Sequence, residues 1–512
     1  MVQRWKGGVL GYHYGRLVPP ELMERIRCNP TAWRLYKREN ALLDEGPQGM
    51  YDVRLDMHHL EVREANIPEL NELRIRRSFR SATKQELASL VKEKVNTERN
   101  VIMVDWIRYR SWFVVICYNA TTGEFSDKYI IRDISAKEVE QWVSDHICVP
   151  DDDVGETLDT LATLQPLHPL VKPIFDFVSP GDLLIFSPAH ILNYIPLHAI
   201  PFQSPTDQPV IEYHPVMYAS SSLVLKECVE RALSRAIPGC PKGRFFCRYP
   251  EDQCVADDAV RQIAHTLESQ SNIRTTYCSG PEVTHTALTS QLPDTDILHF
   301  HGHVTADNLS RHLQVEPEPE PEPPSLALAR SGAAHRLLYP PSPPKTSFSF
   351  QDAISASLQA SLCLLLGCGS GVQEISKADD ALGLVNGFLA AGATTVVATL
   401  WPLNSADAAE WAGYFYQELF RGNNGEGNGD EGRTEATPSE KAARRSPDQG
   451  THELENLLDI ATAMQKSVRE MRLCRKPHCM HKSLKKRLGC HGQKVYRWAP
   501  FVAWGSRVCR KM

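Results

Sequence analysis

Long apolar stretches are missing from this sequence of 512 residues. No segment reaches the roughly 18 uninterrupted apolar residues that a membrane-spanning helix needs, and the amino terminus lacks the apolar block of a secretory signal peptide. The 14 cysteines follow no regular spacing. Cys117 and Cys363 lie inside apolar runs, where reduced buried thiols are common. We therefore predict a soluble, cytoplasmic protein with no membrane partner.

A strong charge of either sign is also missing, because the formal net charge is only −6. No Gly-Lys-Ser/Thr loop is present to hold phosphates, which argues against an NTPase. One basic segment stands out, since residues 474–512 contain eleven Lys or Arg and no Asp or Glu. Inside it, residues 498–505 read as an apolar core strand. A solvated basic face is therefore a better interpretation than a nucleic-acid partner.

The sequence also lacks His and Cys residues at the standard spacing of a metal site. Residues 294–303 read as a short strand ending in His299, His301 and His303. Alternation puts the three imidazoles on one face of a regular strand, where tetrahedral convergence on zinc is awkward. A second group near the end of the sequence has no standard ligand spacing: Cys474, His478, Cys479, His481, Cys490 and His491. We predict no metal site and no cofactor.

The composition divides the chain into two regions. Residues 1–90 are rich in Arg and Glu with weak helical periodicity, and they contain no repeat of fixed period, so we predict a short helical region or linker and no solenoid. Residues 91–512 form the second predicted domain. Two insertions in it are predicted to be disordered: residues 314–345, which include an alternating Glu-Pro run, and residues 421–452, rich in Gly, Asn, Glu and Ser.

Strand and helix patterns alternate through the second region. Apolar strand-like runs occur at residues 101–104, 112–118, 128–131, 182–188, 244–247, 294–300, 362–366 and 394–401. Several of them are separated by helical patterns, as at residues 256–267 and 406–420. Residues 192–199, which are mostly apolar, are also predicted to be extended. This alternation predicts an α/β fold with a mostly parallel sheet flanked by helices and joined by right-handed crossovers.

One strand carries the most informative residues. Leu362-Cys363-Leu364-Leu365-Leu366 is a short apolar run, typical of an interior strand of a parallel sheet. It breaks into Gly367-Cys368-Gly369-Ser370-Gly371, where small residues allow a sharp turn and bring backbone N–H groups close to a bound group. Open α/β sheets bind their ligands at the carboxyl ends of strands. Cys368 is therefore the candidate nucleophile.

Two carboxylates follow the turn. Asp379 and Asp380 stand just before Ala381, where they are predicted to cap a helix that ends at Gly392. The alternative is that they line a substrate pocket near Cys368 and select a basic residue before the cleaved bond. The capping role is the simpler interpretation.

These segments, in this order, resemble the CHAT domain, a caspase-like cysteine peptidase domain of clan CD related to separases. The resemblance spans about residues 76–512 and is most specific over 362–402. The matching segments are a strand-then-proline segment, a serine-rich turn, a histidine strand, a cysteine turn, the most recognisable block and a terminal strand: residues 184–197, 218–223, 296–303, 366–371, 389–402 and 498–505. Residues 379–384 are similar to those of fungal members.

The resemblance implies a caspase-like sheet and specific roles for several residues. Cys368 is the implied nucleophile, and His303 is the implied catalytic histidine because the family's histidine falls four residues after the strand histidine, here His299. His301, followed by Gly302, is the alternative. The implied oxyanion hole uses backbone N–H groups of the cysteine turn, at Cys368 and Gly369, and of the residue after the histidine. Val304 stands there in place of the family's usual small residue.

The implied function is cysteine endopeptidase activity on protein substrates, in regulated proteolysis or cell-death signalling. Members of the family often follow tetratricopeptide repeats, so a repeat or sensor partner is expected. The departure at Val304 and the long insertions leave a second hypothesis, a catalytically inactive CHAT fold that acts as an interaction module. A third is that activity requires release by an upstream sensor.

Overall fold

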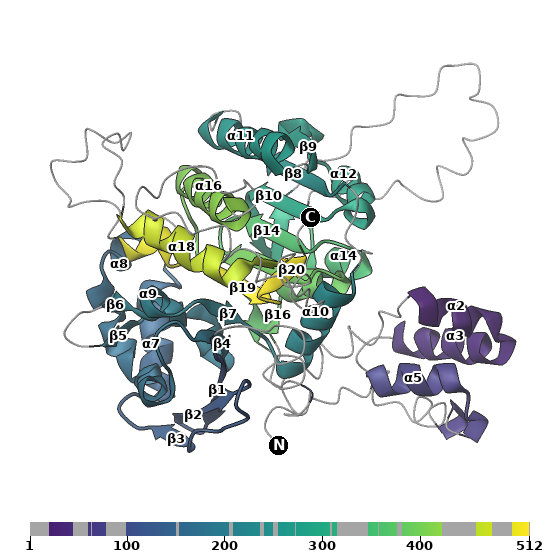
Figure 1. Ribbon diagram of the computed structural model, residues 1–512, viewed down its shortest axis with the longest axis horizontal. Helices are drawn as coiled ribbons and strands as arrows, with labels where there is room; N and C mark the ends of the chain where they lie inside the picture. Colours follow the sequence, from purple (N-terminus) through teal and green to yellow (C-terminus); the bar gives the residue numbers. More distant parts are fainter. Residues whose placement is uncertain are drawn as a thin grey trace, which may run out of the picture.

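The structure, a computed structural model, describes residues 20–44, 60–77 without 63, 86, 99–149, 153–203, 208–235, 240–248, 254–271, 273–307, 310–314, 347–356, 358–375, 381–421, 457–473 and 494–510. Three amino-terminal helices, α2 (Pro20–Cys28), α3 (Pro30–Asp44) and α5 (Pro68–Arg77), bury a small core of their own, separate from the main core. Figure 1 shows them beside the α/β body. The predicted division at residue 90 stays a prediction, and the two predicted insertions fall almost wholly outside the described residues.

An 11-stranded sheet of the described residues organises the α/β body. Its strands lie in this order: β3 (Tyr129–Ile131), β2 (Trp112–Asn119), β1 (Val101–Tyr109), β4 (Leu183–Ser187), β7 (Val216–Tyr218), β19 (Phe501–Gly505), β17 (Thr395–Thr399), β14 (Leu362–Leu366), β10 (Ile297–Gly302), β8 (Lys242–Arg248) and β9 (Arg274–Ser279). The mostly parallel, mixed sheet confirms the predicted fold class, and the apolar runs predicted as strands lie in it.

The direction of the strands changes in the middle of the sheet. β19 pairs in parallel with β7 and antiparallel with β17. On one side of this junction β1, β4 and β7 are parallel to one another. On the other side β17, β14, β10, β8 and β9 are parallel. One strand near the end of the described chain therefore joins two parallel half-sheets.

Helices cover both faces of the sheet. α11 (Cys254–Ser271), α16 (Ser405–Phe420) and α18 (Ile460–Leu473) contact one another in that order and form one layer (Figure 1). α11 connects β8 to β9, at the edge of the sheet. The next crossovers run in the opposite direction, from β9 through β10 and β14 to β17, and they contain α12 (His285–Gln291), α14 (Phe350–Ser355) and α15 (Leu384–Ala391). Because such crossovers are right-handed, these helices lie on the opposite face. α10 (Ser222–Ser234) contacts β19 and bonds to the end of α15 through Arg231.

Side-chain caps fix where several helices begin. Ser349 and Asp352 form a capping box at α14, and the side chain of Asn404 accepts from the backbone N–H of Ala406 at the start of α16. At its end α15 stops at Gly392, whose φ of 128° disfavours any side chain and whose added Cβ would lie 2.1 Å from the Leu358 carbonyl oxygen. The predicted end of this helix at Gly392 is confirmed.

The remaining described elements are short or peripheral. They are α7 (Ala136–His146), α8 (Val154–Thr157), α9 (Val210–Tyr213), α19 (Val495–Trp498), the 3-10 helices η3 (Leu161–Leu170), η4 (Lys172–Phe177), η5 (His190–Tyr194), η6 (Leu197–Ala199), η7 (Gly280–Glu282) and η8 (Leu292–Asp294), and small sheets of β5 (Pro201–Gln203) with β6 (Gln208–Pro209), β11 (Val304–Asp307) with β12 (Ser310–Gln314) and β13 (Ser347–Phe348), β15 (Glu374–Ile375) with β16 (Ala381–Leu382), and β18 (Leu457–Asp459) with β20 (Val508–Arg510).

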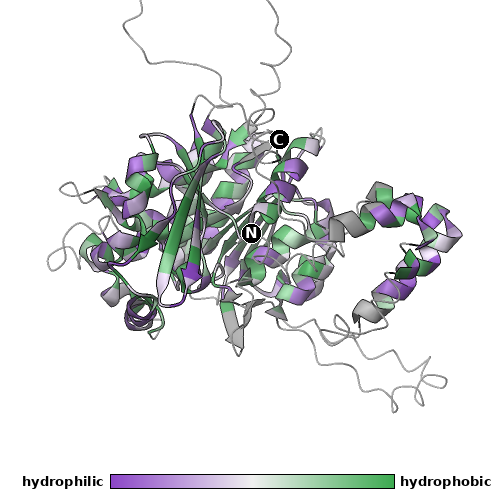
Figure 2. Cartoon of the chain, turned by 90° about the horizontal axis from the view of Figure 1, so that it is seen from below, coloured by the Kyte–Doolittle hydropathy of each residue, from purple (hydrophilic) through white to green (hydrophobic). Residues whose placement is uncertain are grey.

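The core of the body is centred on the strands. All five residues of β14 and all five of β17 are buried, and Figure 2 shows the strands as the most hydrophobic part of the molecule, with hydrophilic residues on the outer faces of the helices. Burial on both faces explains why these strands read as continuous apolar runs instead of alternating ones.

Two local predictions are wrong. A helix was expected from Ala381, but Ala381 and Leu382 form β16, and α15 begins only after Gly383. Residues 381–382 pair with β15 before the helix starts. Gly383 allows its backbone to come close to the backbone of residue 372, since a Cβ on Gly383 would lie 3.1 Å from the Val372 carbonyl oxygen. Residues 192–199 read as extended, but they form η5 and η6, whose buried backbone groups bond locally.

Candidate active site

The turn after β14 presents the thiol of Cys368. Gly369 has a φ of 64°, the left-handed conformation that favours glycine, and the backbone N–H of Ser370 donates to the Gly367 carbonyl at 3.0 Å. Leu366 and Gly367 are buried, whereas Cys368 is only half-buried. Cys368 therefore stands at the carboxyl end of a central strand and is partly exposed to solvent.

Two hydroxyl groups lock this turn. The Ser370 hydroxyl donates to the Leu365 carbonyl and accepts from the backbone N–H of Thr399 at 3.2 Å. The Thr399 hydroxyl donates to the Gly367 carbonyl at 2.5 Å. Both side chains are fully buried, so these bonds exchange little with water. Sequence reasoning missed the two residues; a threonine at the end of the apolar strand beside the cysteine strand is the signal that was available.

The end of β10 lies directly beside the cysteine turn. β10 and β14 are parallel neighbours with His301 opposite Leu366, so His303 and Cys368 each lie two residues beyond the last paired position. Close contact continues past the strands, since a Cβ on Gly367 would lie 2.6 Å from both the Gly302 carbonyl oxygen and the Val304 side chain. The structure therefore brings the two implied catalytic residues to adjacent strand ends.

The two histidines of β10 and His303, which follows the strand, differ in access to solvent. His299 and His301 are fully buried; their rings stack, and the Tyr416 hydroxyl of α16 is 3.2 Å from His299 Nδ1. Burial lowers the pKa of His301 to about 4 and that of His299 well below its usual value. His303 is only half-buried. Of the three, only His303 is partly exposed, whereas His301, the alternative, is buried in the core.

Arg248 is a third charged or titratable residue at these strand ends. It ends β8, on the other side of β10, with its backbone opposite Gly302. A Cβ on Gly302 would lie 2.7 Å from the Arg248 carbonyl oxygen, which explains the glycine between the two histidines. Burial, and to a smaller degree the Arg248 guanidinium, lower the pKa of His303. Neutral imidazole, the form that can accept a proton, is thus favoured.

Val304 and the carboxylates complete the predicted site. Val304 begins β11, pairs with Leu313 of β12 and is almost buried. Its side chain faces Gly367, at the base of the cysteine turn. Asp379 and Asp380 lie outside the described residues, as does the cysteine and histidine group of residues 474–491. Within the described ranges no group of three or more His, Cys, Asp or Glu side chains is placed to hold a metal ion.

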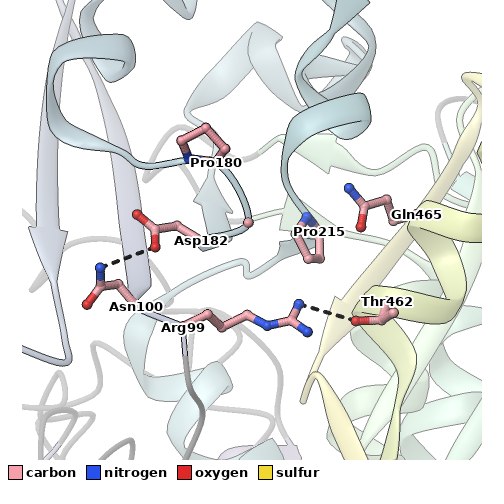
Figure 3. A pocket seen from close by; sticks show the side chains of 8 residues that line it. Arg99, Asn100, Pro180, Asp182, Pro215, Thr462 and Gln465 are labelled. Atoms are coloured by element: carbon pink, nitrogen blue, oxygen red, sulfur yellow. Dashed lines mark hydrogen bonds between the residues drawn. The ribbon is translucent and has the colours of Figure 1, made fainter. Parts of the chain in front are cut away.

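A polar cavity of about 450 Å³ lies elsewhere in the body. Figure 3 shows it between the amino ends of β1, β4 and β7 and the helix α18. Its lining side chains come from the residues before those strands and from α18: Arg99, Asn100, Pro180, Gly181, Asp182, Pro215, Thr462 and Gln465. Internal hydrogen bonds already join Arg99 to Thr462 and Asn100 to Asp182. None of the candidate catalytic residues lines this cavity.

Comparison with solved structures defines the class of fold. The separase of the Saccharomyces cerevisiae separase–securin complex matches with a TM-score of 0.51 and 10% sequence identity, over 88% of this chain and 32% of that chain. Gingipain R, an Arg-specific cysteine proteinase, matches with a TM-score of 0.35 and 11% identity, over 73% of this chain and 76% of that chain. The fold is thus the caspase-like α/β fold of separase, and the chain spans about a third of the separase chain.

The sequence itself identifies the family. The family model described as the CHAT domain matches residues 153–506. The chain therefore belongs to the CHAT domain family. The comparison with curated proteins gave no match. Among the helices of the described residues, none is both long and apolar enough to cross a membrane.

Proposed function

We propose that this protein is a cysteine endopeptidase in which Cys368 and His303 act as a dyad. One observation carries the proposal: β10 and β14 pair in parallel as far as His301 and Leu366, so His303 and Cys368 both follow at the carboxyl ends of two neighbouring central strands. Both side chains are half-buried, whereas the neighbouring residues of their strands are buried. A thiol and an imidazole so placed are the elements of nucleophilic catalysis on an acyl group.

The chemistry needs no other group. His303 accepts the proton of the Cys368 thiol, and the thiolate sulfur adds to the carbonyl carbon of the substrate peptide bond. Backbone N–H groups of the turn at Cys368 and Gly369, and that of Val304, stabilise the negative oxygen of the tetrahedral intermediate. The C–N bond then breaks as imidazolium returns the proton to the leaving amine. Water hydrolyses the thioester, His303 takes its proton, and the new carboxyl terminus leaves.

We further propose protein substrates and a cytoplasmic setting. The described cysteines are all free thiols, as expected of a reducing compartment. Securin accompanies separase in the matched structure, so a protein partner that controls access to Cys368 is a reasonable proposal for this chain. A tetratricopeptide or sensor protein and a role in regulated proteolysis or cell death belong to the same proposal. A preference for a basic residue before the cleaved bond, selected by Asp379 and Asp380, is also part of the proposal.

A second function, an inactive interaction module, has its own support. The Val304 side chain packs toward Gly367, where a smaller residue would leave more room beside the oxyanion. The backbone N–H of Val304 is unaffected by its side chain, so the crowding reduces the hole without removing it. The retained backbone N–H favours a peptidase with a low rate over an inactive protein.

Cleavage of a proteome-derived peptide mixture tests the proposal. The wild-type protein is compared with Cys368→Ala and His303→Ala, and new termini are sequenced. Cys148→Ala is the matched control, because it removes an exposed thiol far along the chain from the turn. Cleavage by the wild type and the control that both dyad variants abolish is expected. Cleavage that persists in Cys368→Ala at the wild-type rate contradicts the dyad, and a folded wild type without cleavage favours the interaction module.

A further inference from the structure

Behind the cysteine turn lies a buried chain of three polar side chains. The Ser220 hydroxyl, in the loop after β7, donates to Asn386 Oδ1 at 2.7 Å. The Asn386 amide, in the first turn of α15, donates in turn to Gln373 Oε1 and to the Ala381 carbonyl, the latter at 2.6 Å. Asn386 is fully buried, Gln373 is 2% exposed and Ser220 is 8% exposed.

These three residues belong to different parts of the fold. Ser220 follows the last strand of the half-sheet that contains β1, β4 and β7. Gln373 lies five residues after Cys368, between the locked turn and β15. Ala381 begins β16, the strand that pairs with β15. One asparagine side chain therefore holds both ends of the segment that leaves the cysteine turn and ties them to the other half-sheet.

The burial of this network makes each of its bonds important. A buried polar group that loses its partner retains the full cost of desolvation, which exceeds the gain from an average hydrogen bond. Within the described residues the Gln373 Nε2 already has no acceptor, so the bond from Asn386 is the contact that anchors this side chain. Removing a partner elsewhere in the network is therefore expected to weaken the hold of Asn386 on the segment after the turn.

The other side of the turn is fixed independently. Ser370 and Thr399 bond to the carbonyl groups of Leu365 and Gly367, which precede the nucleophile, and the backbone N–H of Gly371 donates to the Thr399 carbonyl at 2.7 Å. Beyond Gly371 the chain leaves the sheet. From there, Asn386 is the side chain that determines its path to β15.

We propose that Asn386 and Ser220 are positioning residues that set the reactivity of Cys368 from the other half of the sheet. Their hydrogen bonds hold the segment after the nucleophile, and through it the orientation of the thiol toward His303. The inference rests on the proposed dyad but predicts an effect on the thiol itself. Neither residue touches the substrate or the reacting atoms.

Alkylation of Cys368 by iodoacetamide tests this inference without requiring peptidase activity. The rate is followed by mass spectrometry of the peptide that contains Cys368, in full-length protein. Ser220→Ala and Asn386→Asp are expected to slow it about tenfold, the effect of one hydrogen bond to a buried group. In Ser220→Ala, which introduces no ionisable group, the pH midpoint of the rate is expected to rise, because a thiol turned away from His303 loses a partner that stabilises its thiolate. Ser220→Thr, which keeps the hydroxyl, is expected to restore the rate.

Ser467→Ala is the matched control. Ser467 is a fully buried serine whose hydroxyl bonds only within α18, to the Ala463 carbonyl at 2.8 Å and the Met464 carbonyl at 2.9 Å. A slower rate in Ser220→Ala than in Ser467→Ala, at equal melting temperature, supports the inference. Equal rates in these two variants and the wild type overturn it. Ser220→Ala tests the inference even where Asn386→Asp fails to fold. Normal alkylation of Cys368 in a wild-type protein that cleaves no peptide counts against the proposed function alone.

Discussion

Replacing Gly367 by alanine adds one methyl group, which is expected to push the cysteine turn and the segment of His303 apart. The added Cβ would lie 2.6 Å from the Gly302 carbonyl oxygen and 2.6 Å from the Val304 side chain. These two residues flank His303 in the chain. Because one of the two clashing atoms is a backbone oxygen, rotation of the Val304 side chain alone cannot relieve the clash, and the segment that carries the histidine must move.

The structure sets the size of the effect. Ordinary contact begins at 3.4 Å, so the turn and the histidine segment must move apart by about 0.8 Å. A displacement of about 1 Å costs about 100-fold in rate when reacting groups depend on exact geometry. Overpacking of this kind also destabilises a protein by about 1–3 kcal/mol, which leaves most folded domains folded.

The assay compares peptide cleavage and Cys368 alkylation in Gly367→Ala with those in Gly413→Ala. Gly413 lies in α16 with nothing within 4 Å of an added Cβ, so alanine there should leave activity unchanged and stabilise the helix by about 1 kcal/mol. Gly367→Ala is expected to fold, with a lower melting temperature, and to lose about 100-fold in cleavage. Wild-type cleavage by a folded Gly367→Ala protein would show that His303 does not work beside Cys368.

Three further predictions concern the surroundings of the dyad. Arg248→Gln should raise the pKa of His303, because it removes a nearby positive charge; NMR titration, with His303→Gln to identify the resonance, should show the midpoint at higher pH, and an unchanged midpoint refutes the contact. Burial lowers the folded-state pKa of His301 from 6.5 to about 4, so the unfolded chain binds a proton that the folded chain does not between these values, and stability should fall by about 3 kcal/mol as the pH drops through that window. Urea unfolding of the wild type and of His301→Phe at several pH values from about 4 to 7 checks this. An equal dependence of the free energy of unfolding on pH in the two proteins contradicts it. Thr399→Val should destabilise the protein by about 1 kcal/mol through the lost bond to the Gly367 carbonyl and slow Cys368 alkylation, whereas an unchanged rate would show that the turn holds itself.

The sequence predicts the elements whose causes are local. β14 and its glycine-rich turn follow from an apolar run and a cluster of small residues, and α15 ends where Gly392 adopts a conformation that other residues disfavour. Periodicity and turn chemistry act over a few residues, so both can be read without a structure.

Other features depend on contacts between distant residues. Ala381 looks like the start of a helix until β15 is available to pair with it. His299, His301 and His303 look equivalent in a strand pattern, and only the packing of α16 against β10 separates two core histidines from an accessible one. Asn386 in an apolar helix gives no sign that it bonds to Ser220, 166 positions earlier. The roles of Cys368 and His303 came from family resemblance, and they stay predictions.

The position of β19 has a consequence for the order of events during synthesis. In the sheet, β19 (residues 501–505) lies between β7 (residues 216–218) and β17 (residues 395–399). The two half-sheets therefore cannot join before residue 505 has emerged from the ribosome. Contacts of such long sequence separation form late in folding. A nascent chain therefore carries Cys368 for more than 100 residues of translation before β19 joins the two half-sheets into one.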